Sequence, residues 1–113
     1  QPVADGLVLP QPAAHSDPSW FGYCISVPEG ASASDLTREL EARGIQTRRL
    51  FAGNLVKHPC FDAMRASGEG FRIVGELANT DAIMERTFWL GVGPVMTDAK
   101  LDYMCAAVRD ALH

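Results

Sequence analysis

The residues best suited to bind an anion lie together in one short part of the chain. Between Arg43 and Phe61 there are four basic side chains and no Asp or Glu, whereas the whole chain carries a net charge of −4. The remainder of the chain therefore carries −8, since −4 minus +4 is −8. Arg48 and Arg49 are adjacent here, and the planar guanidinium group matches the oxygens of a phosphate. The segment indicates either a site for a phosphate-bearing ligand or, as is more usual for a few basic side chains, a solvated strand edge.

The loop after the arginine pair is a second candidate site. It comprises residues 51–55, in which Gly53 can adopt a positive φ and Asn54 offers both a donor and an acceptor. A loop between a strand and a helix is a common place for ligand contacts, although the same residues also make an ordinary turn.

The three cysteines are expected to be structural. Cys24, Cys60 and Cys105 are widely spaced and form no CxxC pair, so they indicate neither a disulfide set nor a metal site. His58 lies near Cys60, but Pro59 separates them and no third group orients the pair. The chain has no GxGxxG, P-loop, HExxH or GxSxG pattern. We therefore expect no metal ligands and no complete catalytic set here, and the unpaired thiols favour a cytoplasmic location.

Length and composition indicate one small domain. The chain has 113 residues, of which 47% are apolar and 21% are charged, enough for a single modest core. No apolar run approaches the ~20 residues of a membrane span, so no membrane helix is expected. A pI of about 5.2 argues against nucleic-acid binding. The chain begins at Gln1 without a signal segment, which indicates either processing or, as is favoured, a piece of a longer protein.

Prolines, glycines and capping residues divide the chain into elements. Four of the seven prolines fall within residues 1–18, so this segment is expected to be an extended linker and not a packed element. The period of the apolar residues predicts three strands, at residues 20–27, 45–51 and 87–92, with a brief extended piece at 71–74. Caps and prolines predict four helices: from Ser32 to Gly44, from Pro59 to Gly68, from the run Asn79-Thr80-Asp81, and from Thr97.

This order predicts an α+β two-layer fold. We expect a small, mostly antiparallel sheet of three to four strands with helices packed on one face. The first strand is apolar on both sides, with Phe21, Tyr23 and Ile25 sharing one face. The face of the sheet away from the helices is therefore expected to dock on another part of a larger protein.

Four stretches of the chain, in order, resemble a known family: SDPSWFGYCISV, GIQTRRLFAGNLVKHPCF, FRIVGELANTDAIMERTFWLGVGP and the closing amphipathic helix. Over about residues 18–112 they are similar to the C-terminal part of the DegT/DnrJ/EryC1/StrS family, the pyridoxal-phosphate-dependent sugar aminotransferases. The family at large has a GIGT–HY–PLH-like stretch where this chain has GIQT–LF–AGNL. The motifs RRLFAGNL and NTD–IM–TFWLG are typical of its branch of nucleotide-sugar 3-dehydratases, which serve lipopolysaccharide biosynthesis.

The resemblance implies the small C-terminal domain of a fold-type-I enzyme. Residues 1–18 would then be the linker from a missing large domain, and residues 19–113 the small domain. The missing domain would hold the pyridoxal or pyridoxamine phosphate and the residue facing its C4′, a lysine in the aminotransferases and a histidine in the dehydratases. No cofactor and no catalytic residue are therefore expected in this chain, and Lys57 is not given that role. One subgroup of the family carries an iron–sulfur cluster fed by a reductase, and three scattered cysteines do not suffice to hold it.

The resemblance also implies that this chain contributes the rim of the active site. The implied substrate-binding residues are Trp20, Phe21, Arg48, Arg49, Phe51, Gly53 and Asn54. One arginine would hold the nucleotide diphosphate or a sugar oxygen, and only one, because adjacent strand residues point to opposite faces. Asn54 would help to position the sugar.

The function expected of the parent is removal of the C3 hydroxyl from a nucleotide-linked 4-keto-6-deoxyhexose. The parent would be a cytoplasmic homodimer in lipopolysaccharide or O-antigen deoxysugar biosynthesis, and the isolated chain would be inactive. Two alternatives remain: a sugar aminotransferase of the same family, and a stand-alone α/β domain that binds a small molecule at its basic loop.

Overall fold

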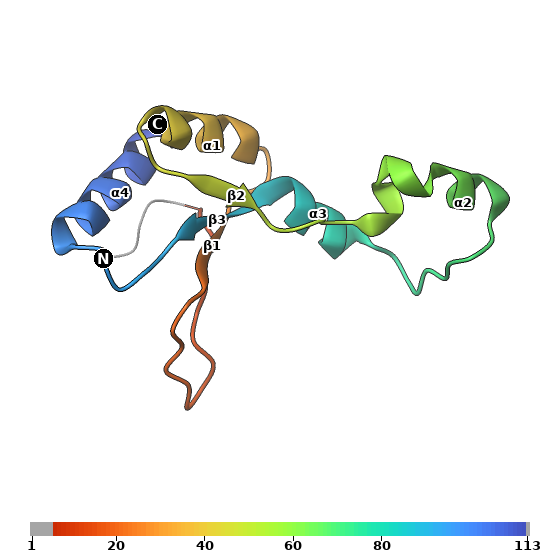
Figure 1. The fold of residues 1–113 in the computed structure, drawn as a ribbon, viewed down its shortest axis with the longest axis horizontal. Helices are drawn as coiled ribbons and strands as arrows, with labels where there is room; N and C mark the ends of the chain where they lie inside the picture. The colour runs from red at the N-terminus through yellow and green to blue at the C-terminus, as the bar shows by residue number, and fades with distance from the viewer. Residues whose placement is uncertain (1–5, 113) are drawn as a thin grey trace.

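The computed structural model describes residues 6–112, in which three strands form one antiparallel sheet (Figure 1). The strands are β1 (Gly22–Ser26), β2 (Thr47–Arg49) and β3 (Thr87–Gly91). Their order in the sheet is β1-β3-β2, so the last strand of the chain lies in the middle. Both outer strands therefore pair with β3.

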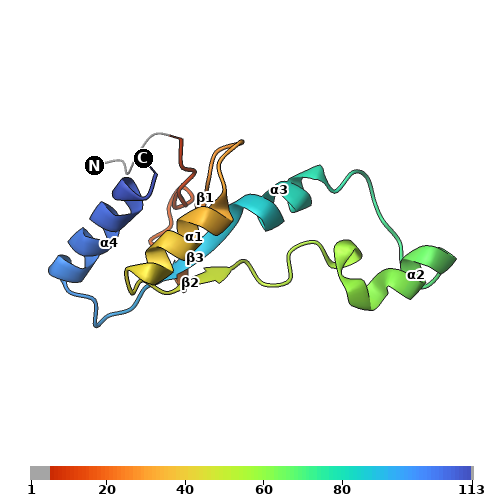
Figure 2. The same cartoon turned by 90° about the horizontal axis from the view of Figure 1, so that it is seen from above.

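Two helices, α1 (Ala33–Ala42) and α4 (Asp98–Asp110), cover one face of this sheet (Figures 1 and 2). The Ser32 hydroxyl accepts from the Asp35 amide at 3.1 Å, and the Thr97 hydroxyl accepts from the Lys100 amide at 3.4 Å. Each bond satisfies an amide that the first turn of a helix leaves unpaired. Both predicted N-caps are confirmed.

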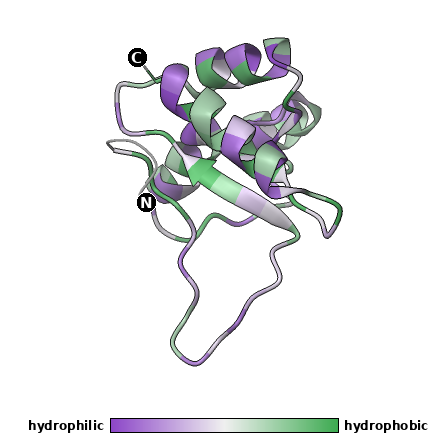
Figure 3. Cartoon of the chain, turned by 90° about the vertical axis from the view of Figure 1, so that its left-hand side faces the viewer, coloured by the Kyte–Doolittle hydropathy of each residue, from purple (hydrophilic) through white to green (hydrophobic). Residues whose placement is uncertain are grey.

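The hydrophobic core lies between this helix pair and the sheet. Phe88 and Leu40 are fully buried at its centre. The other buried apolar residues come from all the surrounding elements and are Ile25, Val27, Ala33, Leu36, Ile45, Leu90, Ala107 and Val108. Figure 3 shows hydrophilic and hydrophobic residues alternating along the helices, as expected where one side of a helix packs and the other meets water. The predicted α+β fold, with helices on one face of an antiparallel sheet, is confirmed.

Residues 50–77 form an arm that extends away from this body (Figures 1 and 2). Its short helices are η1 (Leu55–Lys57), η2 (Pro59–Phe61) and α2 (Asp62–Ser67), and none of them has a buried residue. Pro59 occupies the first position of η2, and Gly68 ends α2 with φ +72°, as predicted. The chain returns to the sheet through α3 (Ala78–Arg86).

Two local predictions are wrong. The run Asn79-Thr80-Asp81 does not cap α3, because the helix begins earlier, after Leu77, and these residues lie inside it. The second strand is restricted to Thr47–Arg49 instead of residues 45–51, because Ile45 is buried in the core and pairs with the end of α1 through the Leu40 carbonyl. Residues 71–74 join no sheet, so the sheet of the described residues has three strands.

The N-terminal segment is also more involved in the fold than predicted. Val8 exchanges two backbone hydrogen bonds with Ser26, with N···O distances of 2.9 and 3.0 Å, and Leu7 and Leu9 pack against the core. The prediction that residues 1–18 contain no packed element is therefore wrong for residues 7–9, whose apolar side chains outweigh the effect of the prolines around them. The part of that prediction on residues 1–5 lies outside the described residues.

Candidate functional site

The face of the sheet opposite the helices carries an aromatic cluster, formed by Phe21, Phe51 and Trp89. The ring centroids of Phe21 and Trp89 are 5.1 Å apart with their planes 33° apart, and those of Phe51 and Trp89 are 6.2 Å apart at 36°. Phe21 and Phe51 are each 80% exposed. Phe21 precedes β1, so strand alternation does not govern it, and the prediction that it shares a face with Tyr23 and Ile25 is wrong.

The indole of Trp89 is held in place by the backbone around it. A Cβ atom on Gly22 would lie 1.6 Å from Cε3 of the indole, so the ring lies directly on a residue that has no side chain. The indole Nε1 also donates to the Arg49 carbonyl at 3.2 Å. Because both contacts come from strands, the centre of the cluster has a fixed orientation.

The two arginines of the basic segment lie on opposite faces of β2, as strand alternation predicts. Arg49 faces the helices and donates to the Glu85 carbonyl of α3 at 3.2 Å and to the Ser34 hydroxyl of α1. Arg48 is paired in register with Trp89, so it lies on the open face. Its side chain is exposed and makes no hydrogen bond or ion pair within residues 6–112. Arg48 is thus the arginine available to a ligand.

The carboxylate of Glu41, whose pKa the charge of Arg48 influences, is hydrogen-bonded to Thr47. Glu41 accepts from the Thr47 amide at 2.5 Å and from the Thr47 hydroxyl at 2.8 Å. These two bonds, and to a smaller extent the charge of Arg48, hold the pKa of Glu41 below its ordinary value. Glu41 keeps its negative charge, and it makes no direct contact with the guanidinium of Arg48 in the described part of the chain.

The loop that presents Phe51 has two unusual backbone positions. Phe51 has φ +47°, a left-handed conformation that bulky residues rarely adopt. Gly53 has φ +62°, and a Cβ atom there would lie 2.4 Å from Cγ of Met84 on α3. Only glycine fits at position 53, because the loop must both turn and press against α3.

Asn54 fixes the same loop to α3 through its side chain. Asn54 is only 3% exposed; its Nδ2 donates to Oδ1 of Asp81 at 2.7 Å, and its Oδ1 accepts from the Val56 amide at 3.1 Å. Nζ of Lys57 contacts the other oxygen of Asp81 at 2.8 Å. The Lys57 ammonium and then the Asn54 amide lower the pKa of Asp81 below its ordinary value. We define this set, Asn54, Lys57 and Asp81, as the loop clamp.

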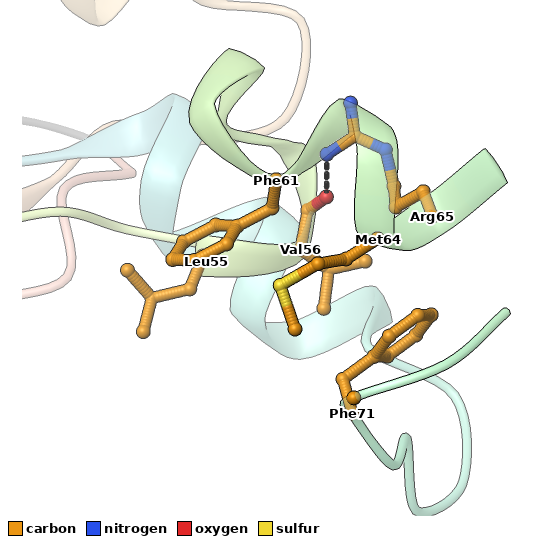
Figure 4. A pocket seen from close by; sticks show the side chains of 7 residues that line it. Leu55, Val56, Phe61, Met64, Arg65 and Phe71 are labelled. Atoms are coloured by element: carbon orange, nitrogen blue, oxygen red, sulfur yellow. Dashed lines mark hydrogen bonds between the residues drawn. The ribbon is translucent and has the colours of Figure 1, made fainter. Parts of the chain in front are cut away.

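An apolar cavity lies farther along the arm (Figure 4). Its volume is about 260 Å³, and Leu55, Phe61, Met64 and Phe71 are among the residues that line it. The guanidinium of Arg65 donates to the Val56 carbonyl at its edge and also to a carboxylate oxygen of Asp62. A second apolar cavity, of about 220 Å³, lies between the sheet and α4. Neither cavity is lined by a lysine.

No metal-binding group of three or more His, Cys, Asp or Glu side chains occurs within residues 6–112. His58 is placed by the loop, since its Nε2 contacts the Ala52 carbonyl, and Cys60 is a free, exposed thiol. In the same part of the chain, the helices are too short or too polar to cross a membrane.

The structure brings together only some of the residues singled out in the sequence. Phe21, Phe51 and Arg48 surround Trp89. Trp20, which precedes Phe21 in the sequence, is partly exposed. Gly53 and Asn54 pack the loop against α3, and Arg49 donates to Ser34 of α1.

Two important residues were missed by the sequence reasoning: Trp89 and Asp81. The alternation in TFWLG could have identified Trp89, since it opposes the core residues Phe88 and Leu90. No local signal marks Asp81, whose partner Asn54 is 27 residues away.

Residues 3–109 match the model of the DegT/DnrJ/EryC1/StrS aminotransferase family. A dTDP-4-dehydro-2,6-dideoxy-D-glucose 3-dehydratase of Saccharopolyspora spinosa is 42% identical over 107 residues, which are 93% of this chain and 22% of that protein. The lipopolysaccharide biosynthesis protein RfbH of Salmonella typhimurium is 43% identical over 112 residues, 97% of this chain and 24% of that protein. The chain thus spans about a quarter of the length of these curated relatives.

A solved structure shares the fold. The E. coli GDP-4-keto-6-deoxy-D-mannose-3-dehydratase with bound hydrated PLP matches 91% of this chain, and 25% of its own, with a TM-score of 0.72 at 18% sequence identity. At that identity the match concerns the fold alone.

Proposed function

The chain belongs to the DegT/DnrJ/EryC1/StrS aminotransferase family, and from that premise we propose that it is the C-terminal small domain of a nucleotide-sugar 3-dehydratase. The observation that carries the proposal is the 42% identity, over 93% of the chain, to a protein named as a 3-dehydratase. The proposed reaction is removal of the C3 hydroxyl from a nucleotide-linked 4-keto-6-deoxyhexose, for lipopolysaccharide deoxysugars. In this proposal the parent is a cytoplasmic homodimer, residues 1–18 lead in from its large domain, and residues 19–113 form the small domain.

Neither lysine of the chain is placed to form a Schiff base with pyridoxal phosphate. The two apolar cavities contain no lysine, Lys57 is paired with Asp81, and Lys100 lies in the exposed first turn of α4. As the resemblance implies, we propose that the remainder of the longer protein binds the cofactor, and we derive no step through it. The isolated chain is proposed to be inactive.

The open face of the sheet is proposed to meet the large domain and to form the rim of the active site. Arg48 is the proposed ligand for the nucleotide diphosphate or a sugar oxygen, because it is exposed and unpaired within the described residues. Trp20, Phe21 and Phe51 would line the rim beside it. Asn54 would act through the loop that it fixes, since its own side chain is buried and bonded.

The reaction is tested with the complete polypeptide that carries this chain. The purified protein is supplied with pyridoxamine phosphate and a nucleotide-linked 4-keto-6-deoxyhexose, with and without an iron–sulfur reductase, and the sugar product is analysed by mass spectrometry. We expect a sugar that has lost the C3 hydroxyl. An amino sugar formed from an amino-acid donor would instead establish the aminotransferase alternative. Binding without turnover would favour the small-molecule-binding domain.

The role of Arg48 is tested by kinetics of the same protein. Arg48→Ala should raise KM for the nucleotide sugar about tenfold or more, because a charge-assisted contact to phosphate is lost. Arg38→Ala is the matched control, since Arg38 is an exposed arginine of α1 whose side chain contacts only Asp35 within the described residues. Equal KM values for the Arg48→Ala variant and the unmodified protein would remove Arg48 from the site.

A further inference from the structure

We propose that Asp81 of α3 is a positioning residue, which fixes the loop of residues 51–55 in place without touching a ligand itself. Asp81 lies inside a helix, and the loop side chain that it contacts, Asn54, is 27 positions away in the sequence. The loop forms part of the rim of an active site only under the proposed function, so the inference rests on that function in this respect.

One face of α3 receives both the end of β2 and the loop that follows it. Asp81, Met84 and Glu85 share this face, because side chains three and four positions apart are neighbours on a helix. Sδ of Met84 accepts from the backbone amide of Asn54 at 3.3 Å, and the Glu85 carbonyl accepts from Arg49 at 3.2 Å. Since α3 runs directly into β3, this face connects the loop to the central strand of the sheet.

Both carboxylate oxygens of Asp81 are engaged from the side of the loop. Oδ1 accepts from Nδ2 of Asn54 at 2.7 Å, and Oδ2 lies 2.8 Å from Nζ of Lys57. Asn54 is the N-cap of η1 and Lys57 is its last residue, so one carboxylate holds this short helix at both of its ends. The Lys57 ammonium and then the Asn54 amide lower the pKa of Asp81, and the carboxylate is therefore ionised at neutral pH.

The side chain of Asn54 depends on Asp81 for its place. Asn54 is 3% exposed, and its Oδ1 already accepts from the Val56 amide at 3.1 Å. Without the carboxylate, Nδ2 would be a buried donor that has lost its acceptor, which is unfavourable. We expect the loop to shift in that case until the amide group reaches water.

The backbone of the loop needs such a fixed support. Phe51 has φ +47° and Gly53 has φ +62°, and a left-handed conformation at a bulky residue persists only where its surroundings hold it. Arg49 fixes the chain to the helices before this turn, and Asp81 fixes it after the turn. Loss of Asp81 should therefore let Phe51 relax and move its ring away from Trp89, whose centroid is now 6.2 Å away.

The first test is kinetic and uses the complete polypeptide that carries this chain, with the substrate of the proposed reaction. Asp81→Ala should raise KM about tenfold and change kcat by about twofold or less, because the displaced loop no longer helps to hold the substrate. A merely structural role would reduce the amount of active enzyme, and hence the apparent kcat, at an unchanged KM. An unchanged KM in Asp81→Ala would therefore overturn the proposal.

A double-mutant cycle tests whether Asp81 acts through Asn54. Asn54→Ala, Asp81→Ala and the double variant are compared by their KM values. The increase in the double variant should be clearly smaller than the product of the two single increases, because both substitutions remove the same contact. An increase equal to that product would mean that the two residues act independently, which contradicts the proposal.

Hydrogen exchange of the complete polypeptide supplies a readout that needs no turnover. Asp81→Ala should speed exchange of the Asn54 and Val56 amides about tenfold or more, while the amides of α1 exchange as in the unmodified protein. Faster exchange in α1 by the same factor would indicate global destabilisation, and it would overturn the positioning role. Unchanged exchange at Asn54 and Val56 would overturn it as well.

Asp110→Ala is the matched control. The Asp110 carboxylate also joins two elements through an ion pair, with Arg43 at 3.3 Å, but it lies on the helix layer. This variant should keep the KM and the loop exchange of the unmodified protein, and changes equal to those of Asp81→Ala would overturn the proposal. If dehydration fails while Asp81→Ala speeds exchange of the loop alone, the function is wrong and the positioning of the loop by Asp81 stands. If dehydration is observed and neither KM nor exchange changes, the function stands and the positioning role is wrong.

Discussion

The two faces of one short sheet differ in what they do for the molecule. On the helix face, Phe88 and Leu90 of β3 are buried beneath α1 and α4. On the open face, Trp89 from the same strand lies with Phe21 and Phe51 in an exposed cluster. Three consecutive residues thus serve two purposes, because the side chains of a strand alternate. The side chains on the helix face stabilise the fold, and those on the open face are available for binding.

The largest effect is expected from removing a core ring. Phe88→Ala should lower the free energy of unfolding by about 3–5 kcal/mol, because a fully buried side chain leaves a cavity. Phe21→Ala removes a phenyl ring from the open face instead. This variant should change the free energy of unfolding by about 0.5 kcal/mol or less. Urea unfolding of the 113-residue chain, followed by circular dichroism, measures both values. Similar losses for the two variants would break the distinction between the faces.

A smaller effect is expected where the open face is itself tightly packed. Gly22→Ala places a Cβ atom 1.6 Å from the Trp89 indole, so the ring must move. The expected destabilisation is about 1–3 kcal/mol, together with a shift of the tryptophan emission. Gly91→Ala is the control, since Gly91 is the register partner of Gly22 and a Cβ atom there meets nothing within 4 Å. If the two variants have equal stability and equal emission, Trp89 is not held by Gly22.

A third test concerns the loop clamp behind Phe51. The lowered pKa of Asp81 means that the folded state favours its carboxylate, so this contribution to stability is present above the ordinary carboxyl pKa of 3.8 and is lost as the pH falls through the lower, folded value. The unmodified chain should therefore be more stable than Asp81→Asn at neutral pH, and the difference should shrink as the pH falls below 3.8. Thermal unfolding of both proteins, measured across this pH range, tests the predicted difference in stability. A difference that is the same at every pH would show that the charge of Asp81 has no role in the clamp.

The smallest effect is expected on the outer side of the helix layer. Arg43 of the α1 end contacts Asp110 of α4 at 3.3 Å, but the Asp110 side chain is 69% exposed. Because water and salt screen such a pair, Asp110→Asn should unfold at the same urea concentration as the unmodified chain. A loss as large as that of Gly22→Ala would mean that ion pairs, and not the apolar core, hold the helices on the sheet.

Much of the fold follows from short stretches of sequence. Ser32 and Thr97 cap the two long helices, Gly68 ends α2, and alternation separates Arg48 from Arg49. Each of these features depends on residues within a few positions of one another, so a local pattern suffices to predict it.

The failed predictions share a different cause. Leu7 and Leu9 pack on the core although prolines surround them, and β2 is shorter than its apolar pattern because Ile45 turns into the core. Asn54 offered a donor and an acceptor in the sequence, but in the fold the donor binds Asp81 of α3 and the acceptor binds the Val56 amide two residues ahead. In each case contacts with residues far along the chain contributed to the outcome.

By itself the sequence determined the kinds of element, their order and the two-sided character of the strands, since periodicity and capping act locally. Tertiary structure alone decided that Trp89 lies on Gly22, which is 67 positions earlier, and that Phe21 and Phe51 gather around it. The physical reason is that this cluster requires β3 to be paired with both β1 and β2. Pairing between distant strands fixes which exposed rings meet, and no local pattern specifies it.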